Sequence, residues 1–283
     1  MNENPDFLSG RRVAIVGLGL IGGSLAMALT GHVARLFGID QDEHVLALAR
    51  EGRVVDEVSR DPARLLPAAD VVILATPVGM ILQTLAALPG LCPGPAVVMD
   101  VGSTKVEIVK AMAGLPPRFD PIGGHPMAGK ERLSLANAEP GLFRGIPFAL
   151  TPLPRTSTQA KGLAIELCQA IGAHPLVLDP EEHDRWVAAT SHLPYLVSSA
   201  LILSTPDEVA PMIGPGFRST TRLAATPSSM MLDVLRTNSG HIREALARLK
   251  NELDRVDDLL SAENSEALEA WLISAREKKE RLP

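Results

Sequence analysis

The sequence Gly17-Leu18-Gly19-Leu20-Ile21-Gly22 follows the apolar run Arg12–Val16 and opens an apolar stretch of helical character. In a strand-to-helix turn of this kind, the first glycine permits the tight turn, the second lets a pyrophosphate approach the backbone, and the third lets the helix pack close to the strand. Unpaired amides at the start of the helix then face the anion. The segment predicts a dinucleotide-binding turn. Its predicted cofactor-binding residues are Gly17, Gly19, Leu20, Ile21 and Gly22.

An acidic residue stands where the adenosine ribose of such a cofactor would lie. The next strand-like run, Val33–Ile39, is followed by Asp40, about 20 residues past the turn, where a carboxylate accepts hydrogen bonds from ribose hydroxyls. Its alternative role is to cap the helix that begins near Glu43. Asp40 would repel a 2′-phosphate, and Gln41, Asp42 and Glu43 offer no arginine to receive one. The sequence therefore favours NAD over NADP.

Bulk composition indicates a globular chain. Its 283 residues are 46% hydrophobic, enough for a packed core over two modest domains. The formal net charge of -6 argues against nucleic acid or an anionic membrane as a partner. No run reaches about 18 uninterrupted apolar residues and segment 1–10 lacks a signal-peptide core, so we expect a cytoplasmic protein. Cys92 and Cys168 are too isolated to suggest a disulfide framework or a metal site.

Short apolar runs alternate with helical patterns from Arg11 to about Asp179. This alternation is typical of an α/β fold with a doubly wound, mostly parallel sheet of the Rossmann type. Such sheets bind ligands beyond the carboxyl ends of their strands. The predicted strands are Arg12–Val16, Leu36–Ile39, Val71–Ala75, Ala96–Val101, Pro121–Gly124, Ile146–Leu150 and Leu176–Leu178.

After Pro180 the pattern changes to helices alone. Three strand-poor segments, Glu181–Leu203, Ser228–Leu249 and Asn251–Lys279, have apolar residues at helical spacing. Pro194 is expected to end or kink the first of them. We predict a dinucleotide-binding domain over residues 1–180 and an all-helical domain over residues 181–283, whose apolar stripe suits core packing or a dimer seam.

Three loops that follow predicted strands carry residues suited to chemistry. They are Thr76-Pro77-Val78, Gly102-Ser103-Thr104-Lys105 and Gly124-His125-Pro126-Met127-Ala128-Gly129. Since imidazole titrates near neutrality and the flanking glycine and proline fix the backbone, His125 suits a general base for hydride transfer from an alcohol. Its alternative role is a buried turn histidine. Ser103 is expected to orient the imidazole or the substrate hydroxyl, or to cap the next helix, while Lys105 is expected on a solvated helix face.

The helical half contributes further candidates. Arg218 and Arg222 lie four residues apart, so one helix face presents guanidinium groups to an acidic substrate, with surface ion pairing as the alternative. His183-Asp184 and Ser191-His192-Leu193-Pro194-Tyr195 add two histidines to the first helical segment.

In their order along the chain, these motifs resemble those of the prephenate and arogenate dehydrogenases of tyrosine biosynthesis. The resemblance covers about residues 10 to 240. Its most specific part is His125-Pro126-Met127-Ala128-Gly129 with Gly102-Ser103-Thr104-Lys105 upstream. The other matching pieces are Gly17–Gly22, Ala75–Val78, His183-Asp184, Ser191–Pro194 and Gly216–Arg222.

The resemblance implies an NAD-dependent oxidative decarboxylation. His125 would take the C4 hydroxyl proton of a cyclohexadienol, C4 would deliver hydride to the nicotinamide, and the ring carboxylate would leave as CO2. Ser103 would hydrogen-bond His125, Arg222 would bind a substrate carboxylate, and Glu131 would belong to an ionic gate near that arginine. The family also implies a homodimer formed by the helical domain, with the active site in the interdomain cleft.

The same resemblance places Thr76 and Pro77 at the cofactor and His192 and Tyr195 at the substrate. The chain departs from the family pattern at Tyr195, Met231 and Ser219, three positions that the resemblance places at the substrate pocket. Arogenate carries an ammonium where prephenate has a keto oxygen, so its selection favours a nearby acid. Because Tyr195 and Ser219 are not acidic, we expect prephenate as the substrate, with arogenate as the alternative.

Two other classes of function stay open. Another NAD-dependent hydroxyacid dehydrogenase would share the cofactor half and give His125 no special role. A non-catalytic NAD sensor would need neither a base nor a carboxylate clamp. The match around His125 argues against the other dehydrogenase, and the presence of His125, Ser103 and Arg222 in one chain argues against the sensor.

Overall fold

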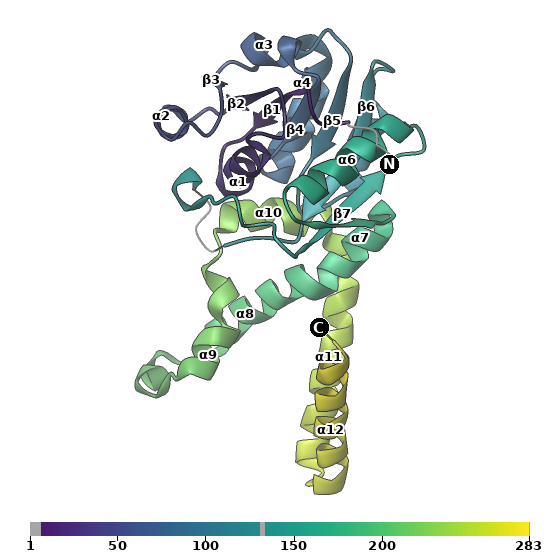
Figure 1. The fold of residues 1–283 in the computed structure, drawn as a ribbon. Helices are drawn as coiled ribbons and strands as arrows, with labels where there is room; N and C mark the ends of the chain where they lie inside the picture. The colour runs from purple at the N-terminus through teal and green to yellow at the C-terminus, as the bar shows by residue number, and fades with distance from the viewer. Residues whose placement is uncertain (1–6, 131–133, 283) are drawn as a thin grey trace, which may run out of the picture. The chain divides into compact units, whose positions relative to one another are not determined.

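The computed structural model describes residues 7–130 and 134–282, and the chain divides after Asn238 into two compact units (Figure 1). The first unit holds the sheet and the helices up to α10 (Ser228–Thr237). The second consists of α11 (Ser239–Ser261) and α12 (Ser265–Arg281), which pack together and are joined by a hydrogen bond of 3.0 Å from Trp271 Nε1 to Glu252 Oε2. Glu131 lies outside the described residues.

The first unit is built on an eight-stranded sheet with the order β3-β2-β1-β4-β5-β6-β7-β8. The strands are β1 (Arg12–Val16), β2 (Arg35–Ile39), β3 (Glu57–Ser59), β4 (Val71–Leu74), β5 (Ala96–Asp100), β6 (Phe119–Pro126), β7 (Pro147–Pro152) and β8 (His174–Val177). Among the described strands, only the β6 and β7 pairing is antiparallel. The strand order reverses between β1 and β4, a switch point at which sheets of this kind bind ligands.

Alternate side chains of the strands enter two separate cores. On β1, Val13 and Ile15 belong to one core, whereas Ala14 and Val16 belong to the other, as the two-residue period of a strand requires. The first core is covered by α1 (Leu20–Leu29), α2 (Glu43–Glu51) and α6 (Thr158–Ala170), and the second by α3 (Pro62–Leu65), α4 (Val78–Leu91) and α5 (Val106–Ala113) (Figure 1). Because both faces are covered, the strands read as continuous apolar runs.

The helices that follow the sheet are α7 (Pro180–Val187), α8 (Leu193–Ser204), α9 (Pro215–Thr220) and α10 (Ser228–Thr237). A single π-helical turn, Ala188–His192, joins α7 to α8. This turn comes just before Pro194, which has no backbone N–H to donate to the carbonyl four residues earlier. The interruption therefore lies where it was predicted. By length and composition alone, the run Pro180–Ser204 is the one described helix that is apolar enough to cross a membrane.

The predicted α/β architecture is confirmed, with two local differences. The short strand β3 was not predicted, because Glu57-Val58-Ser59 contains a single large apolar residue. The expected junction near residue 250 is wrong, since it lies inside α11, and the described helices are separated instead at residues 262–264 and at Asn238. There the Asn238 side chain donates to the Asp184 carbonyl at 2.7 Å, a tertiary contact that helical spacing does not reveal.

Gly22 provides a test of the strand-to-helix turn. A Cβ at this position would lie 1.9 Å from the Gly17 carbonyl oxygen and 3.1 Å from the Ala75 Cβ. Because the turn must open to admit it, we expect Gly22→Ala to lower the free energy of unfolding by about 1–3 kcal/mol in chemical denaturation. Gly90→Ala is the control, since a Cβ there meets nothing within 4 Å. Equal effects of the two substitutions would contradict tight packing at Gly22.

Candidate active site

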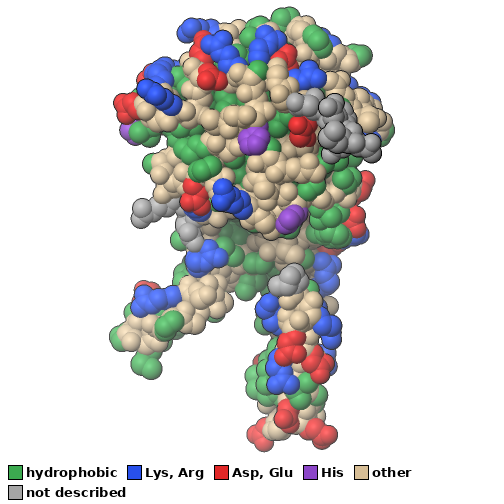
Figure 2. Space-filling model, viewed as in Figure 1, with side chains coloured by type: hydrophobic (Ala, Val, Ile, Leu, Met, Phe, Trp, Pro, Cys, Tyr) green, Lys and Arg blue, Asp and Glu red, His purple; other side chains and the backbone are tan. Residues whose placement is uncertain are grey.

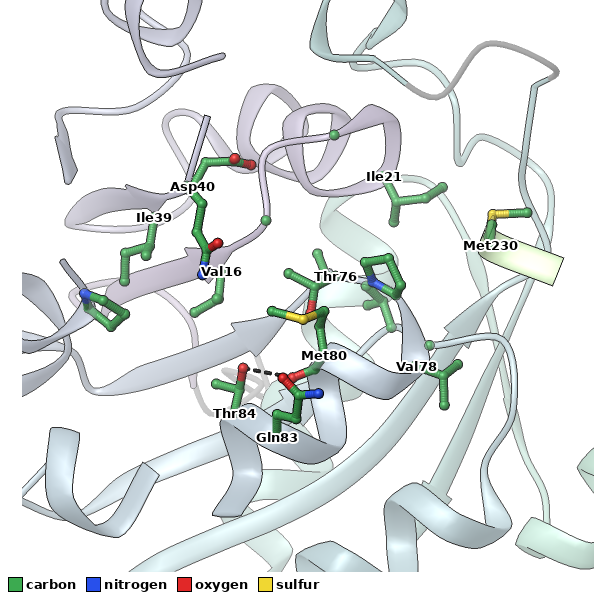
Figure 3. Close-up of a pocket in the computed structure, with 18 of the residues that line it drawn as sticks. Val16, Ile21, Ile39, Asp40, Thr76, Val78, Met80, Gln83, Thr84 and Met230 are labelled. Carbon is green, nitrogen blue, oxygen red and sulfur yellow. Dashed lines mark hydrogen bonds between the residues drawn. The ribbon is translucent and has the colours of Figure 1, made fainter. Parts of the chain in front are cut away.

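A pocket of about 660 Å³ opens at the switch point of the sheet (Figure 3). Ile39 and Asp40 lie at one end of it and Met230 of α10 at the other, with Thr76 between them (Figure 3). The predicted cofactor residues that line it are Gly17, Gly19, Leu20, Ile21, Asp40, Thr76 and Pro77. The sixth position of the motif, Gly22, is buried in the first turn of α1.

Asp40 holds the glycine turn while facing this pocket. Its Oδ2 accepts a hydrogen bond of 2.8 Å from the Leu18 amide, and its Oδ1 accepts one of 3.0 Å from the Asp42 amide. Each carboxylate oxygen has a further lone pair for a ribose hydroxyl. The alternative capping role falls to Asp42, whose side chain accepts the His44 amide at 2.9 Å.

Thr76 shows that the pocket fits a polar ligand. Its Oγ1 is buried and, within the described part of the chain, has no hydrogen-bond partner. Thr76 also lies against the glycine turn, because a Cβ at Gly17 would be 2.8 Å from the Thr76 Cγ2. Since an unpaired buried hydroxyl costs free energy, a ligand that offers a hydrogen-bonding group at this point would bind favourably. The turn, Asp40 and Thr76 together fit a dinucleotide.

His125 begins a chain of hydrogen bonds that crosses from the sheet to α7. It lies half-buried in β6, and its Nδ1 is 2.9 Å from Nε2 of His183. The Nδ1 of His183 is in turn 2.8 Å from Oδ1 of Asp184. The Asp184 carboxylate also accepts the amides of Lys105 and Val106, at 2.7 and 3.0 Å, where α5 begins. Asp184 therefore binds both the start of a helix and the second histidine.

These contacts determine which nitrogen of each ring carries the proton. Because the Asp184 carboxylate only accepts, the Nδ1 of His183 carries hydrogen and its Nε2 accepts from the Nδ1 of His125. The Nε2 of His125 then keeps its lone pair. Burial, with the nearby His183, Lys105 and His192, lowers the pKa of His125 well below 6.5, so the ring is neutral at pH 7. A neutral imidazole with a basic nitrogen is the form that a general base requires.

A buried ion pair holds the strand that carries His125. The Nζ of Lys105 donates to Oδ2 of Asp100 and, at 2.6 Å, to the carbonyl of Gly124. Asp100 also accepts the amides of Gly102 and Gly124, at 2.8 and 3.2 Å. Burial raises the pKa of Asp100 and lowers that of Lys105, while their mutual attraction opposes both shifts. The pair fixes the residue before His125, and the expectation of a solvated Lys105 is wrong.

His192 joins the same cluster from the π-helical turn. It is buried, and its Nδ1 lies 3.2 Å from Nδ2 of Asn238, which also donates to the Asp184 carbonyl. Burial, partly offset by the Asp184 charge, lowers the pKa of His192 to about 4. His192 is therefore neutral at pH 7. His192 thus lies close to the His125 chain, and its role at the substrate remains a prediction.

The remaining predicted residues lie around this cluster. Ser103 lines the pocket, but the described partner of His125 Nδ1 is His183 rather than Ser103. Tyr195 is half-buried in the first turn of α8, and Arg222 begins the short helix Arg222–Ala225 with an exposed side chain. The roles of Ser103, Tyr195, Arg222 and Glu131 at the substrate remain predictions.

Sequence reasoning missed the roles of four members of the cluster, His183, Asp184, Lys105 and Asn238. The pair His183-Asp184 was recognised only as a motif, and no pattern indicated that Asp184 would orient His125 through His183. Lys105 was missed because its position before a helix is typical of an exposed lysine. Asn238 gave no signal, since it stands inside a continuous helical pattern.

The buried ion pair predicts unequal effects for two lysines of the same segment. Lys105→Met leaves the Asp100 charge buried without its cation, so we expect a loss of about 3–5 kcal/mol in the free energy of unfolding, measured by urea denaturation. Lys110→Met, on the exposed face of α5, is expected to change it by no more than about 0.5 kcal/mol. If both variants unfold like the wild type, the Lys105 interaction does not stabilise the fold.

Two family models match adjacent parts of the chain. Residues 25–177 match the nucleotide-binding domain of prephenate dehydrogenase, and residues 179–274 match the dimerization domain of prephenate dehydrogenase. Among curated proteins, the prephenate dehydrogenase of Bacillus subtilis strain 168 is 33% identical, over 100% of this chain and 78% of that protein.

Solved structures agree with the sequence matches. Prephenate dehydrogenase from A. aeolicus, in complex with hydroxyphenyl propionate and NAD+, superimposes with a TM-score of 0.90 and 28% identity, over 98% of this chain and 99% of that chain. Synechocystis arogenate dehydrogenase has a TM-score of 0.82 and 30% identity, over 96% of this chain and 100% of that chain.

Proposed function

This chain belongs to the prephenate dehydrogenase family, and from this premise we propose that it catalyses the NAD-dependent oxidative decarboxylation of prephenate to 4-hydroxyphenylpyruvate. The observation that carries the proposal is the hydrogen-bond chain from Asp184 through His183 to His125. This chain of hydrogen bonds leaves His125 as a neutral base near the carboxyl end of β6, in a sheet that fits a dinucleotide. Arogenate, the substrate named for the Synechocystis relative, is the alternative.

His125 has two proton-transfer steps in this reaction. Bound NAD supplies the hydride acceptor. The Nε2 of His125 takes the C4 hydroxyl proton as the hydride leaves C4, so that a carbonyl forms there. Loss of the ring carboxylate as CO2 then moves an electron pair into the ring and gives the phenolate. The imidazolium returns its proton to that oxygen, so the reaction consumes no net proton.

Asp184 stabilises the charged form of His125 without taking its proton. When His125 becomes an imidazolium, its Nδ1–H donates more strongly to His183, and the Asp184 carboxylate lies at the far end of the same chain. The orientation of both rings is set before the substrate binds, because Asp184 is itself held by the amides of Lys105 and Val106. Preorganised charge of this kind lowers the barrier to proton transfer.

The substrate side of the proposal follows the family resemblance. Arg222 would bind a substrate carboxylate, Ser103 would orient the C4 hydroxyl, and His192 and Tyr195 would line the ring. Glu131 would form the ionic gate. The pocket is lined both by residues before 180 and by Ser229, Met230 and Val234 of α10, which supports an active site between domains over residues 1–180 and 181–283.

We also propose a homodimer formed by the helical domain. The second family model carries the description of a dimerization domain. Large hydrophobic side chains are exposed on the helices of this region, among them Leu203 and Met212 in the first unit and Leu253, Leu260 and Leu272 in the second. Figure 2 shows hydrophobic side chains between charged ones on these helices. Burial of such groups against a second copy is favourable. We propose in addition that the protein is cytoplasmic and has no nucleic-acid partner.

The direct test is NADH formation by the purified protein, followed by absorbance, with prephenate and with arogenate and with NAD and NADP. We expect turnover of prephenate with NAD, and at least about tenfold lower kcat/KM for arogenate because no acid is predicted to face its ammonium. Faster turnover of arogenate would reassign the substrate. Silence with both substrates, despite NAD binding, would contradict the proposed chemistry.

His125→Asn tests the base. We expect kcat to fall by about two orders of magnitude or more, with little change in the Kd for NAD, because the substitution removes only the proton acceptor. The control is His174→Asn at an exposed position on β8. A drop confined to NAD affinity would show that His125 acts at the cofactor instead.

The pH dependence of the wild type belongs to the same test. Only neutral His125 accepts a proton, so kcat/KM should stay level from pH 7 into the acid range. It should fall as the pH drops through the pKa of His125, which lies well below 6.5. An acid limb centred above 6.5 would contradict the lowered pKa of the His183-bound base.

A further inference from the structure

Arg60 lies beside Asp40 at the edge of the sheet where the cofactor pocket opens. It directly follows β3, and β3 pairs with β2 so that Ser59 is the partner of Ile39. The Asp40 amide donates to the Ser59 carbonyl at 3.3 Å. Arg60 and Asp40 both line the pocket. The adenosine end therefore contains an arginine, although the residues that follow Asp40 in the sequence supply none.

The backbone that carries Arg60 is held on both sides. The hydroxyl of the buried Ser59 donates to the Asp61 carbonyl and accepts the Asp61 amide, both at 3.0 Å. The Asp61 side chain accepts the Ala63 amide at 2.9 Å and so caps α3. Arg60 thus projects an exposed side chain from a fixed turn, which keeps its guanidinium within reach of the pocket.

Within the described part of the chain, no ion pair neutralises the charge of Arg60. Two arginines of the neighbouring elements β2 and α2 are paired with carboxylates, Arg35 with Glu57 and Arg50 with Glu43, each at 3.1 Å. For Arg60, no carboxylate of the described residues lies within ion-pairing distance, and this includes Asp40 beside it. The positive charge of Arg60 and the negative charge of Asp40 therefore both face a ligand bound at the adenosine end of the pocket.

We propose that Arg60 and Asp40 together determine the cofactor specificity of this site. Asp40 binds the ribose hydroxyls and repels a 2′-phosphate, while Arg60 supplies the cation that such a phosphate would need, since guanidinium pairs well with phosphate oxygens. The preference for NAD then rests on the single negative charge of Asp40. Removal of that charge turns the same site into one that accepts NADP. This inference rests on the cofactor part of the proposed function.

The test is a double-mutant cycle on direct cofactor binding, measured by calorimetry without substrate. The variants are the wild type, Asp40→Asn, Arg60→Gln and the double variant, each with NAD and NADP. The asparagine introduced by Asp40→Asn keeps a side-chain oxygen that accepts the Leu18 amide, so the glycine turn retains that bond. We expect Asp40→Asn to bind NADP about tenfold or more tightly than the wild type does, and the double variant to lose most of that gain.

Arg64→Gln is the matched control, because Arg64 lies on α3 one turn beyond Arg60 and outside the pocket lining. Combined with Asp40→Asn, it should leave the gain in NADP affinity unchanged. If Asp40→Asn gains nothing, or if the gain survives Arg60→Gln, the inference is wrong while NAD binding by the wild type stands. If the wild type binds neither cofactor, the proposed function itself fails. Should Asp40→Asn not fold, Asp40→Ser enters the same cycle with the same expectations.

Discussion

The buried carboxylate of Asp184 is the interaction on which the site depends. A charge in the protein interior is costly unless it is paired and hydrogen-bonded, and here the ring nitrogen of His183 and the amides of Lys105 and Val106 surround it. Two of those donors are the unpaired amides at the start of α5. One carboxylate therefore caps a helix of the sheet domain, fastens α7 to it, and orients the histidine that holds His125.

A second buried pair, Asp100 with Lys105, determines where His125 lies along its strand. Lys105 contributes its backbone amide to Asp184 and its side chain to Asp100 and Gly124. The two acidic residues are thus connected through one lysine. Burial and positive charge from Lys105 both lower the pKa of His125, so the elements that fix the position of the base also keep it unprotonated. Position and protonation state follow from the same contacts.

Local patterns in the sequence were sufficient for the parts of the fold that are built from neighbouring residues. The strand β1, the glycine turn and α1 form one continuous segment, and the apolar runs of the other parallel strands reflect burial on both faces. The same patterns failed at β3, which is too short to show an apolar run, and at Asn238, where a side-chain contact to Asp184 ends a helix that the spacing continues.

By itself, the sequence determined the α/β fold, the cofactor turn, Asp40 and the candidate base His125, because each depends on residue type and spacing within a single strand and the loop after it. Only the tertiary structure decided that His183, 58 residues from His125, is its partner, that Lys105 is buried, and that Arg60 lies beside Asp40. Those relations arise from which strands and helices become neighbours. Sheet order and helix packing fix them, and no local spacing encodes the resulting distances.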